Sequence, residues 1–126
     1  MQFLTIINDK EVFRFPFDKI VYVTSDGNYS VIHMADGSEC TLTTQLKLLY
    51  KKIKSQLGQS DTIFTRVGKQ LVVNIGYVSY VNPTKQELKL KDYKTFTIKK
   101  SASQTALKML KDRFTNGNWD DDEEED

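Results

Sequence analysis

Hydrophobic and polar residues alternate in short runs over the first third of the chain. Such alternation is typical of half-buried β-strands. Asn8-Asp9 separates the first two runs, as in a β-hairpin, and Asp26-Gly27 separates the next two. Glycine supplies the positive φ that a tight turn needs, and Asp36-Gly37 repeats the pattern. The predicted strands are residues 2–7, 10–15, 19–24, 28–34 and 39–43. Their order predicts a hairpin followed by a meander over residues 19–43.

The spacing of the apolar residues becomes helical after residue 45. The apolar stripe consists of Leu46, Leu49, Tyr50, Ile53 and Leu57, and the other faces carry Lys47, Lys51, Lys52 and Lys54. Thr43 or Thr44 can cap the start of this helix, and Gly58 can end it. We therefore predict a helix that packs on the core and exposes a basic back.

Strand patterns return after Gly58 and give way to a second helix near the end. The further predicted strands are residues 63–67, 71–74, 77–81, 86–91 and 95–98. The second helix has a stripe of Ala106, Leu107, Leu110 and Phe114, with Ser101 or Ser103 as its cap and Gly117 past its end. The fold class is therefore mainly β, with about ten short strands, one mid-chain helix and a C-terminal helix.

The residues that usually carry enzyme or metal chemistry are scarce in this chain of 126 residues. His33 is the only histidine and Cys40 the only cysteine, so neither an internal disulfide nor a cysteine metal cluster can form. No glycine-rich phosphate-binding motif occurs. We predict that the protein is not an enzyme and holds no cofactor or metal, with His33 and Cys40 as structural strand residues.

The net charge of +1 conceals a strong asymmetry. Residues 120–126 read DDDEEED, and without them 18 basic residues face 10 acidic ones, a net charge of +8 over residues 1–119. We predict one domain at residues 1–117 and an acidic, disordered tail at 118–126. A basic body attracts polyanions. The chain contains no apolar run long enough for a membrane span and no leader pattern, so we expect a cytoplasmic protein with no membrane partner.

The most informative segment is FTRVGKQLVVNIGYVSYV, residues 64–81. It follows IVYVTSDGNYSVIHMADG at 20–37 and QLKLLYKKI at 45–53, and it precedes FTIKKSASQTALKML at 96–110. In this order and spacing, the four segments resemble the signature of the LytTR family of bacterial DNA-binding domains. Within residues 64–81, the positions that carry the resemblance are Phe64, Arg66, Leu71, Val72, Val73 and Asn74.

The resemblance implies an elongated stack of small β-sheets that binds double-stranded DNA through loops entering successive major grooves. It implies a bacterial transcriptional regulator, related to response regulators, that acts on direct repeats and so as a dimer on DNA. Family members usually carry a receiver domain, which this sequence lacks. We therefore expect an unidentified sensor or regulatory partner.

Carried over position by position, the resemblance assigns base contacts to Asn28, Lys69 and Lys100. The family often has arginine or asparagine at the position of Lys69 and usually has arginine at the position of Lys100. Lysine keeps the charge there but lacks the bidentate fork of arginine. The chemistry agrees, because asparagine can pair with adenine and lysine can donate to guanine. The candidate contacts to the DNA backbone are Tyr29, Arg66, Lys94, Lys99, Ser101 and Ser103.

Two other interpretations remain open from the sequence. The missing receiver domain and the acidic tail also fit a protein-interaction module on a LytTR-like β scaffold. The tail itself can either mimic a polyanion and compete for the basic body, or serve as a solubility device. Salt-dependent affinity for a duplex distinguishes DNA binding from the interaction module.

Overall fold

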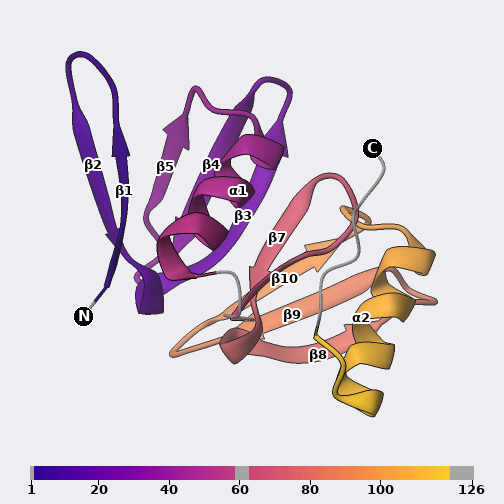
Figure 1. The fold of residues 1–126 in the computed structure, drawn as a ribbon. Helices are drawn as coiled ribbons and strands as arrows, with labels where there is room; N and C mark the ends of the chain where they lie inside the picture. The colour runs from indigo at the N-terminus through magenta and orange to yellow at the C-terminus, as the bar shows by residue number, and fades with distance from the viewer. Residues whose placement is uncertain (1, 59–62, 120–126) are drawn as a thin grey trace.

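The computed structural model describes residues 2–58 and 63–119, and it confirms the mainly β fold class. Within these ranges the chain forms ten strands in three sheets, two α-helices and two short 3-10 helices (Figure 1). The strands are β1 (Phe3–Ile7), β2 (Val12–Pro16), β3 (Ile20–Asp26), β4 (Tyr29–Met34), β5 (Glu39–Leu42), β6 (Phe64–Arg66), β7 (Leu71–Asn74), β8 (Val78–Asn82), β9 (Glu87–Lys91) and β10 (Thr95–Lys99). The helices are η1 (Phe17–Lys19), α1 (Leu46–Leu57), η2 (Ile75–Tyr77) and α2 (Gln104–Asn116).

The central sheet has five strands in the order β5-β4-β3-β7-β6. Its β3, β4 and β5 form the antiparallel meander that the sequence predicts. The pairing of β3 with β7 joins segments far apart in the chain, with Thr24 opposite Leu71. Just beyond that pair, the N–H of Ser25 donates to the carbonyl of Gln70 at 3.0 Å. The β3–β4 turn and the β6–β7 loop therefore lie at the same end of the sheet.

One face of the central sheet is covered by α1 and the β1–β2 hairpin. Leu4 of the hairpin and Leu49 and Ile53 of α1 belong to one buried cluster with Val72 of the sheet. The side-chain amide of Gln56 in α1 also bonds both backbone groups of Thr5, at 2.9 Å each. These bonds satisfy the backbone of one residue on the edge of β1 that does not pair with β2, where an unpaired strand exposes polar groups.

The opposite face is covered by the three-stranded sheet β10-β9-β8 and by α2 (Figure 1). Leu71 and Val73 belong to this second cluster, whereas Val72 between them belongs to the first. This alternation is the reason that β7 is buried along its whole length. From outside the central sheet, Leu90 of β9 and Leu107 of α2 complete the cluster.

The residues that begin and end the two α-helices are those predicted from the sequence, except at the start of α1. Ser103 caps α2 by accepting a hydrogen bond from the N–H of Ala106 at 3.0 Å, and Gly117 ends that helix with φ +72°. Gly58 ends α1, as predicted. The prediction that Thr43 or Thr44 caps α1 is wrong, because the N-cap is Gln45 and its side chain makes no capping bond. The two 3-10 helices, η1 and η2, are further elements that the sequence pattern did not predict.

The C-terminal end of the described chain packs on the domain. Trp119, which the sequence assigns to the tail, packs against the second cluster, with its ring edge-on to Phe114 at 4.7 Å. The acidic run at 120–126 lies outside the described residues. Across residues 2–58 and 63–119, no helix has the length and apolar character needed to cross a bilayer. In the same ranges, His, Cys, Asp and Glu form no group of three that could hold a metal.

Candidate nucleic-acid interface

Asn28 lies in the two-residue turn between β3 and β4. Asp26 pairs with Tyr29 across the turn, and Gly27 takes the positive φ of +63° that the reversal needs. The Asn28 side chain is exposed, and its Oδ1 accepts a hydrogen bond from Nε2 of Gln45 at 3.1 Å. The turn therefore presents a polar amide that contacts one neighbouring side chain.

Lys69 lies at the tip of the β6–β7 loop. The N–H of Val67 closes the loop on the carbonyl of Leu71 at 2.8 Å, and Gly68 has φ +71°. Nη2 of Arg66 donates to the Lys69 carbonyl at 3.2 Å. The loop is therefore held by its backbone and by Arg66, while the Lys69 side chain is exposed.

Lys100 directly follows β10 and has a left-handed backbone with φ +62°. Its N–H donates to the carbonyl of Gln86, in the β8–β9 turn, at 2.8 Å. The exposed Lys100 side chain therefore starts from a backbone held at a defined place, close in sequence to the Ser103 cap of α2.

Direct contacts join the Asn28 hairpin, the Lys69 loop and the helix that follows Lys100. The hydrogen bond from Ser25 to Gln70 links the β3–β4 hairpin to the β6–β7 loop. A Cβ built on Gly68 would lie 3.5 Å from the Cβ of Ala106, in the first turn of α2. The loop of Lys69 thus lies between the turn of Asn28 and the start of α2, where the Lys100 segment ends.

The candidate backbone-contact residues are distributed unevenly around this end of the domain. Tyr29 is 48% exposed beside Asn28. Lys99 forms an ion pair with Glu87, with 3.7 Å between Nζ and the carboxylate. Ser101 is half-buried, and the Ser103 hydroxyl oxygen is used by the helix cap. All four lie on the segments that carry Asn28 and Lys100.

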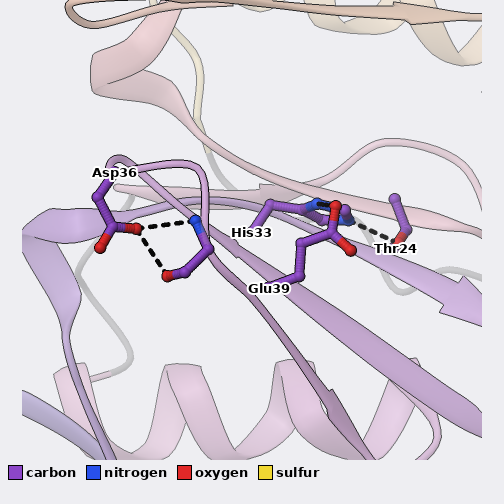
Figure 2. Close-up of polar contacts among 5 residues, drawn as sticks. Thr24, His33, Asp36 and Glu39 are labelled. Carbon is purple, nitrogen blue, oxygen red and sulfur yellow. Dashed lines mark hydrogen bonds and ion pairs between the residues drawn. The ribbon is translucent and has the colours of Figure 1, made fainter.

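Lys94 lies away from the three loops, in the β9–β10 turn at the opposite end of the small sheet from Lys100. Its Nζ donates to the carbonyl of Asp36 at 3.2 Å, in the β4–β5 turn. The Asp36 carboxylate accepts from the hydroxyl and the N–H of Ser38, and these bonds lower the pKa of Asp36 below its usual value (Figure 2). Lys94 therefore joins two turns of the scaffold.

The single histidine lies within the meander and bonds to side chains on both sides. Figure 2 shows His33 between Thr24 and Glu39, with 3.1 Å from Nε2 to the Thr24 hydroxyl and 3.4 Å from Nδ1 to the Glu39 carboxylate. The Tyr22 ring stacks on the imidazole at 4.0 Å. Burial lowers the pKa of His33, although Glu39 opposes that shift. The histidine is thus a packed and bonded residue of the sheet.

Asn74, one of the residues that carry the family resemblance, has a structural explanation. It is buried, its Nδ2 donates to the carbonyl of Ile20 at 2.9 Å, and its Oδ1 accepts from the N–H of Gly76 at 2.9 Å. The amide therefore joins the end of β7 to the start of β3 and begins η2. A mostly apolar cavity of about 610 Å³ lies at this end of the sheet, lined in part by Phe17, Ile75 and Tyr77.

Gln45 is the residue of this interface that sequence reasoning missed. Its contact with Asn28 joins residues that are far apart in the chain, and no local pattern encodes it. The sequence contained one indirect signal for this contact. Glutamine is not a preferred N-cap residue, so its position directly before α1 indicates that its side chain has another partner.

A β scaffold with exposed amide and ammonium groups on adjoining loops is an arrangement that suits the binding of a nucleic acid. The family model for the LytTr DNA-binding domain matches residues 10–115, so the chain belongs to the LytTR family, which is not an enzyme family. Among solved structures, the LytTr DNA-binding domain of a Bacillus cereus protein shares the fold. It is 14% identical, with a TM-score of 0.60 over 90% of this chain and 97% of that one. Among curated proteins, none matches the chain significantly.

Proposed function

We propose that this LytTR domain regulates transcription in the bacterial cytoplasm by binding double-stranded DNA in a sequence-specific way. In this proposal Asn28, Lys69 and Lys100 contact bases and enter successive major grooves. The observation that carries the proposal is the pair of contacts, Ser25 to Gln70 and Gly68 to Ala106, that joins the β3–β4 hairpin, the Lys69 loop and the first turn of α2, which follows Lys100 in the chain. Separate loops on a rigid scaffold can then meet one rod-shaped polyanion together.

The surrounding residues have different proposed roles. In this proposal Tyr29, Arg66, Lys99, Ser101 and Ser103 contact phosphates. Arg66 also holds the β6–β7 loop, because it donates to the carbonyl of Lys69. Lys94 instead stabilises the scaffold through the Asp36 carbonyl. Binding to direct repeats as a pair of domains, under a separate sensor partner, follows from the family resemblance and is part of the same proposal.

The decisive experiment compares Lys69→Ala and Lys100→Ala with Lys91→Ala on a duplex selected from a random pool. Lys91 is also exposed, but it lies at the end of β9 that pairs with Thr95, away from Lys100. We expect each of the first two variants to lose about 1–3 kcal/mol of binding free energy on the selected site. Lys91→Ala should retain wild-type affinity.

The dependence of affinity on salt separates the two kinds of contact. A lysine that contacts only phosphate weakens selected and random duplexes equally, and its loss reduces the salt slope by about 0.9. A base contact weakens the selected duplex more. If the wild-type domain shows no salt-dependent affinity for any duplex, the DNA-binding proposal is wrong and the interaction-module interpretation takes its place.

A further inference from the structure

Gln45 occupies the N-cap of α1, yet its side chain does not cap the helix. Residues at this position usually direct a side-chain oxygen to the free N–H groups of the first turn. Here the amide leaves the helix, and Nε2 donates to Oδ1 of Asn28 at 3.1 Å. The first turn of α1 accordingly lies beside the β3–β4 turn (Figure 1).

The backbone on both sides of the Gln45 side chain is fixed. The buried Ser30 hydroxyl donates to the carbonyl of Thr44 at 2.6 Å. The carbonyl of Gln45 accepts the helical hydrogen bond from the N–H of Leu49 at 2.9 Å, and Leu49 is fully buried. The core therefore fixes the backbone from which the Gln45 side chain reaches Asn28, although both amides lie at the surface.

We propose that Gln45 is a positioning residue that sets which end of the Asn28 amide faces the DNA and so determines the base that Asn28 selects. The inference rests on the proposed function of Asn28. An asparagine amide carries two N–H donors at one end and an acceptor oxygen at the other. In the structure Nε2 of Gln45 binds the oxygen, so the Nδ2 end is turned away from Gln45 and its donors are available to a base.

The bases present different donors and acceptors in the major groove, so the orientation of the Asn28 amide determines which base it prefers. Guanine presents the acceptors N7 and O6, adenine presents N7, and thymine presents O4, whereas cytosine presents only the N4 donor. An Asn28 amide that offers donors therefore selects against cytosine at the position that it contacts. This selectivity depends on a residue that itself touches no base.

The substitution Gln45→Glu should reverse the orientation. A carboxylate can only accept hydrogen bonds, so the Asn28 amide must turn its Nδ2 end toward the glutamate. The Oδ1 atom then faces the groove and accepts from cytosine N4 or adenine N6. Gln45→Ala removes the partner and leaves both orientations accessible.

The test is selection of bound duplexes from a random pool by the whole wild-type chain and four variants. Asn28→Ala identifies the position that Asn28 contacts, because the base preference disappears there. At that position we expect Gln45→Ala to weaken the preference by about 2- to 10-fold, the range of one net hydrogen bond. Gln45→Glu should shift the preference toward cytosine or adenine. Gln56→Ala is the matched control, since Gln56 is an exposed glutamine at the other end of α1 that bonds Thr5.

The outcomes separate this inference from the function on which it rests. If Asn28→Ala leaves every base preference unchanged, the base-contacting role of Asn28 is wrong, and the positioning role of Gln45 is wrong with it. If Asn28→Ala removes one preference but both Gln45 variants retain the wild-type base there, only the Gln45 inference is overturned. An equal loss at all positions in Gln45→Ala would assign Gln45 a structural role and also overturn the inference.

Discussion

At the scale of single residues, Lys100 combines a strained backbone with an exposed charge. Its φ of +62° lies in the left-handed region, which costs a residue with a Cβ about 1–2 kcal/mol relative to the right-handed one. The hydrogen bond from its N–H to Gln86, at 2.8 Å, helps to hold this conformation. Strained residues of this kind concentrate at functional sites, where the surrounding structure maintains them.

Replacing Lys100 by glycine should therefore change stability and DNA binding in opposite directions. Lys100→Gly relieves the strain, and we expect the free energy of unfolding in urea to rise by up to about 1 kcal/mol. Affinity for the selected duplex should fall, because the ammonium group is lost. The matched control is Lys100→Ala, which loses the same charge but keeps a Cβ, and should lower affinity without a gain in stability. A glycine variant that is no more stable than the alanine variant would contradict the strain argument.

Residue patterns also show how much of the site could be predicted. Asn28, Lys69 and Lys100 follow from turn signals and motif position, since each lies beside a strand end that the local pattern marks. The contact between Gln45 and Asn28 could not be predicted, because it depends on how α1 lies against the sheet. The hydrogen bond from Lys94 to Asp36 could not be predicted for the same reason, because Asp36 lies in a turn of another sheet.

At the scale of elements, α2 begins where the Lys100 segment ends, so under the proposed function its cap affects both stability and DNA binding. The Ser103 hydroxyl accepts from the N–H of Ala106 at 3.0 Å, and Ala106 also adjoins Gly68 of the Lys69 loop. Fraying of this first turn would loosen the contact that joins the two segments.

Two substitutions at Ser103 separate the cap from the surface charge. Ser103→Ala removes the cap and should lower the free energy of unfolding by about 0.5–2 kcal/mol. Ser103→Asp retains a capping oxygen, so we expect near wild-type stability, but its negative charge should weaken binding to every duplex. Urea denaturation and fluorescence anisotropy measure the two effects. Tight DNA binding by Ser103→Asp would exclude Ser103 from the DNA-facing surface.

His33 of β4 contacts side chains of β3 and β5. Its partial burial makes the stability of the folded state depend on pH. Burial lowers the pKa of His33 below its ordinary value of 6.5, against the opposing effect of Glu39. The folded state therefore binds fewer protons than the unfolded chain just below pH 6.5. Stability is retained above that pH and is lost as the pH falls toward the lowered pKa.

The variant His33→Gln should remove this component of the pH dependence. We expect wild-type protein to lose stability between neutral pH and the mildly acidic range, and the variant to lose less over the same interval. Thermal unfolding midpoints at a series of pH values measure the difference. Parallel curves for the two proteins would show that the titration of His33 is not coupled to folding.

At the scale of the whole molecule, local patterns predicted the elements but not their assembly. Alternation, turn residues and helical stripes found the ten strands and both α-helices, because those signals lie within a few residues of each other. The pairing of β3 with β7 and the division into two buried clusters depend on contacts between distant segments. Leu71 and Val72 are both apolar in the sequence, and only the assembled layers show that they enter different clusters.

The distribution of charge over the whole chain yields a further prediction. Deleting residues 120–126 removes seven acids and raises the net charge from +1 to +8, while it leaves Trp119 in place. If the tail competes with DNA for the basic body, the truncated protein should bind random duplexes more tightly and with a steeper dependence on salt. Equal affinity before and after truncation, at low and high salt, would leave the tail as a solubility device.

The packing of the small sheet on the central sheet bears on how related domains could come to recognise base pairs at a different spacing. The small sheet rests on the central sheet through side chains, among them the edge-on contact of Tyr22 with Phe96 at 5.9 Å. Asn28 follows a strand of the central sheet and Lys100 follows a strand of the small sheet. The distance between the two sheets therefore sets the distance between the two side chains that contact bases under the proposed function. Larger or smaller side chains between the two sheets would then change the spacing of the recognised base pairs, although no residue that contacts those base pairs is altered.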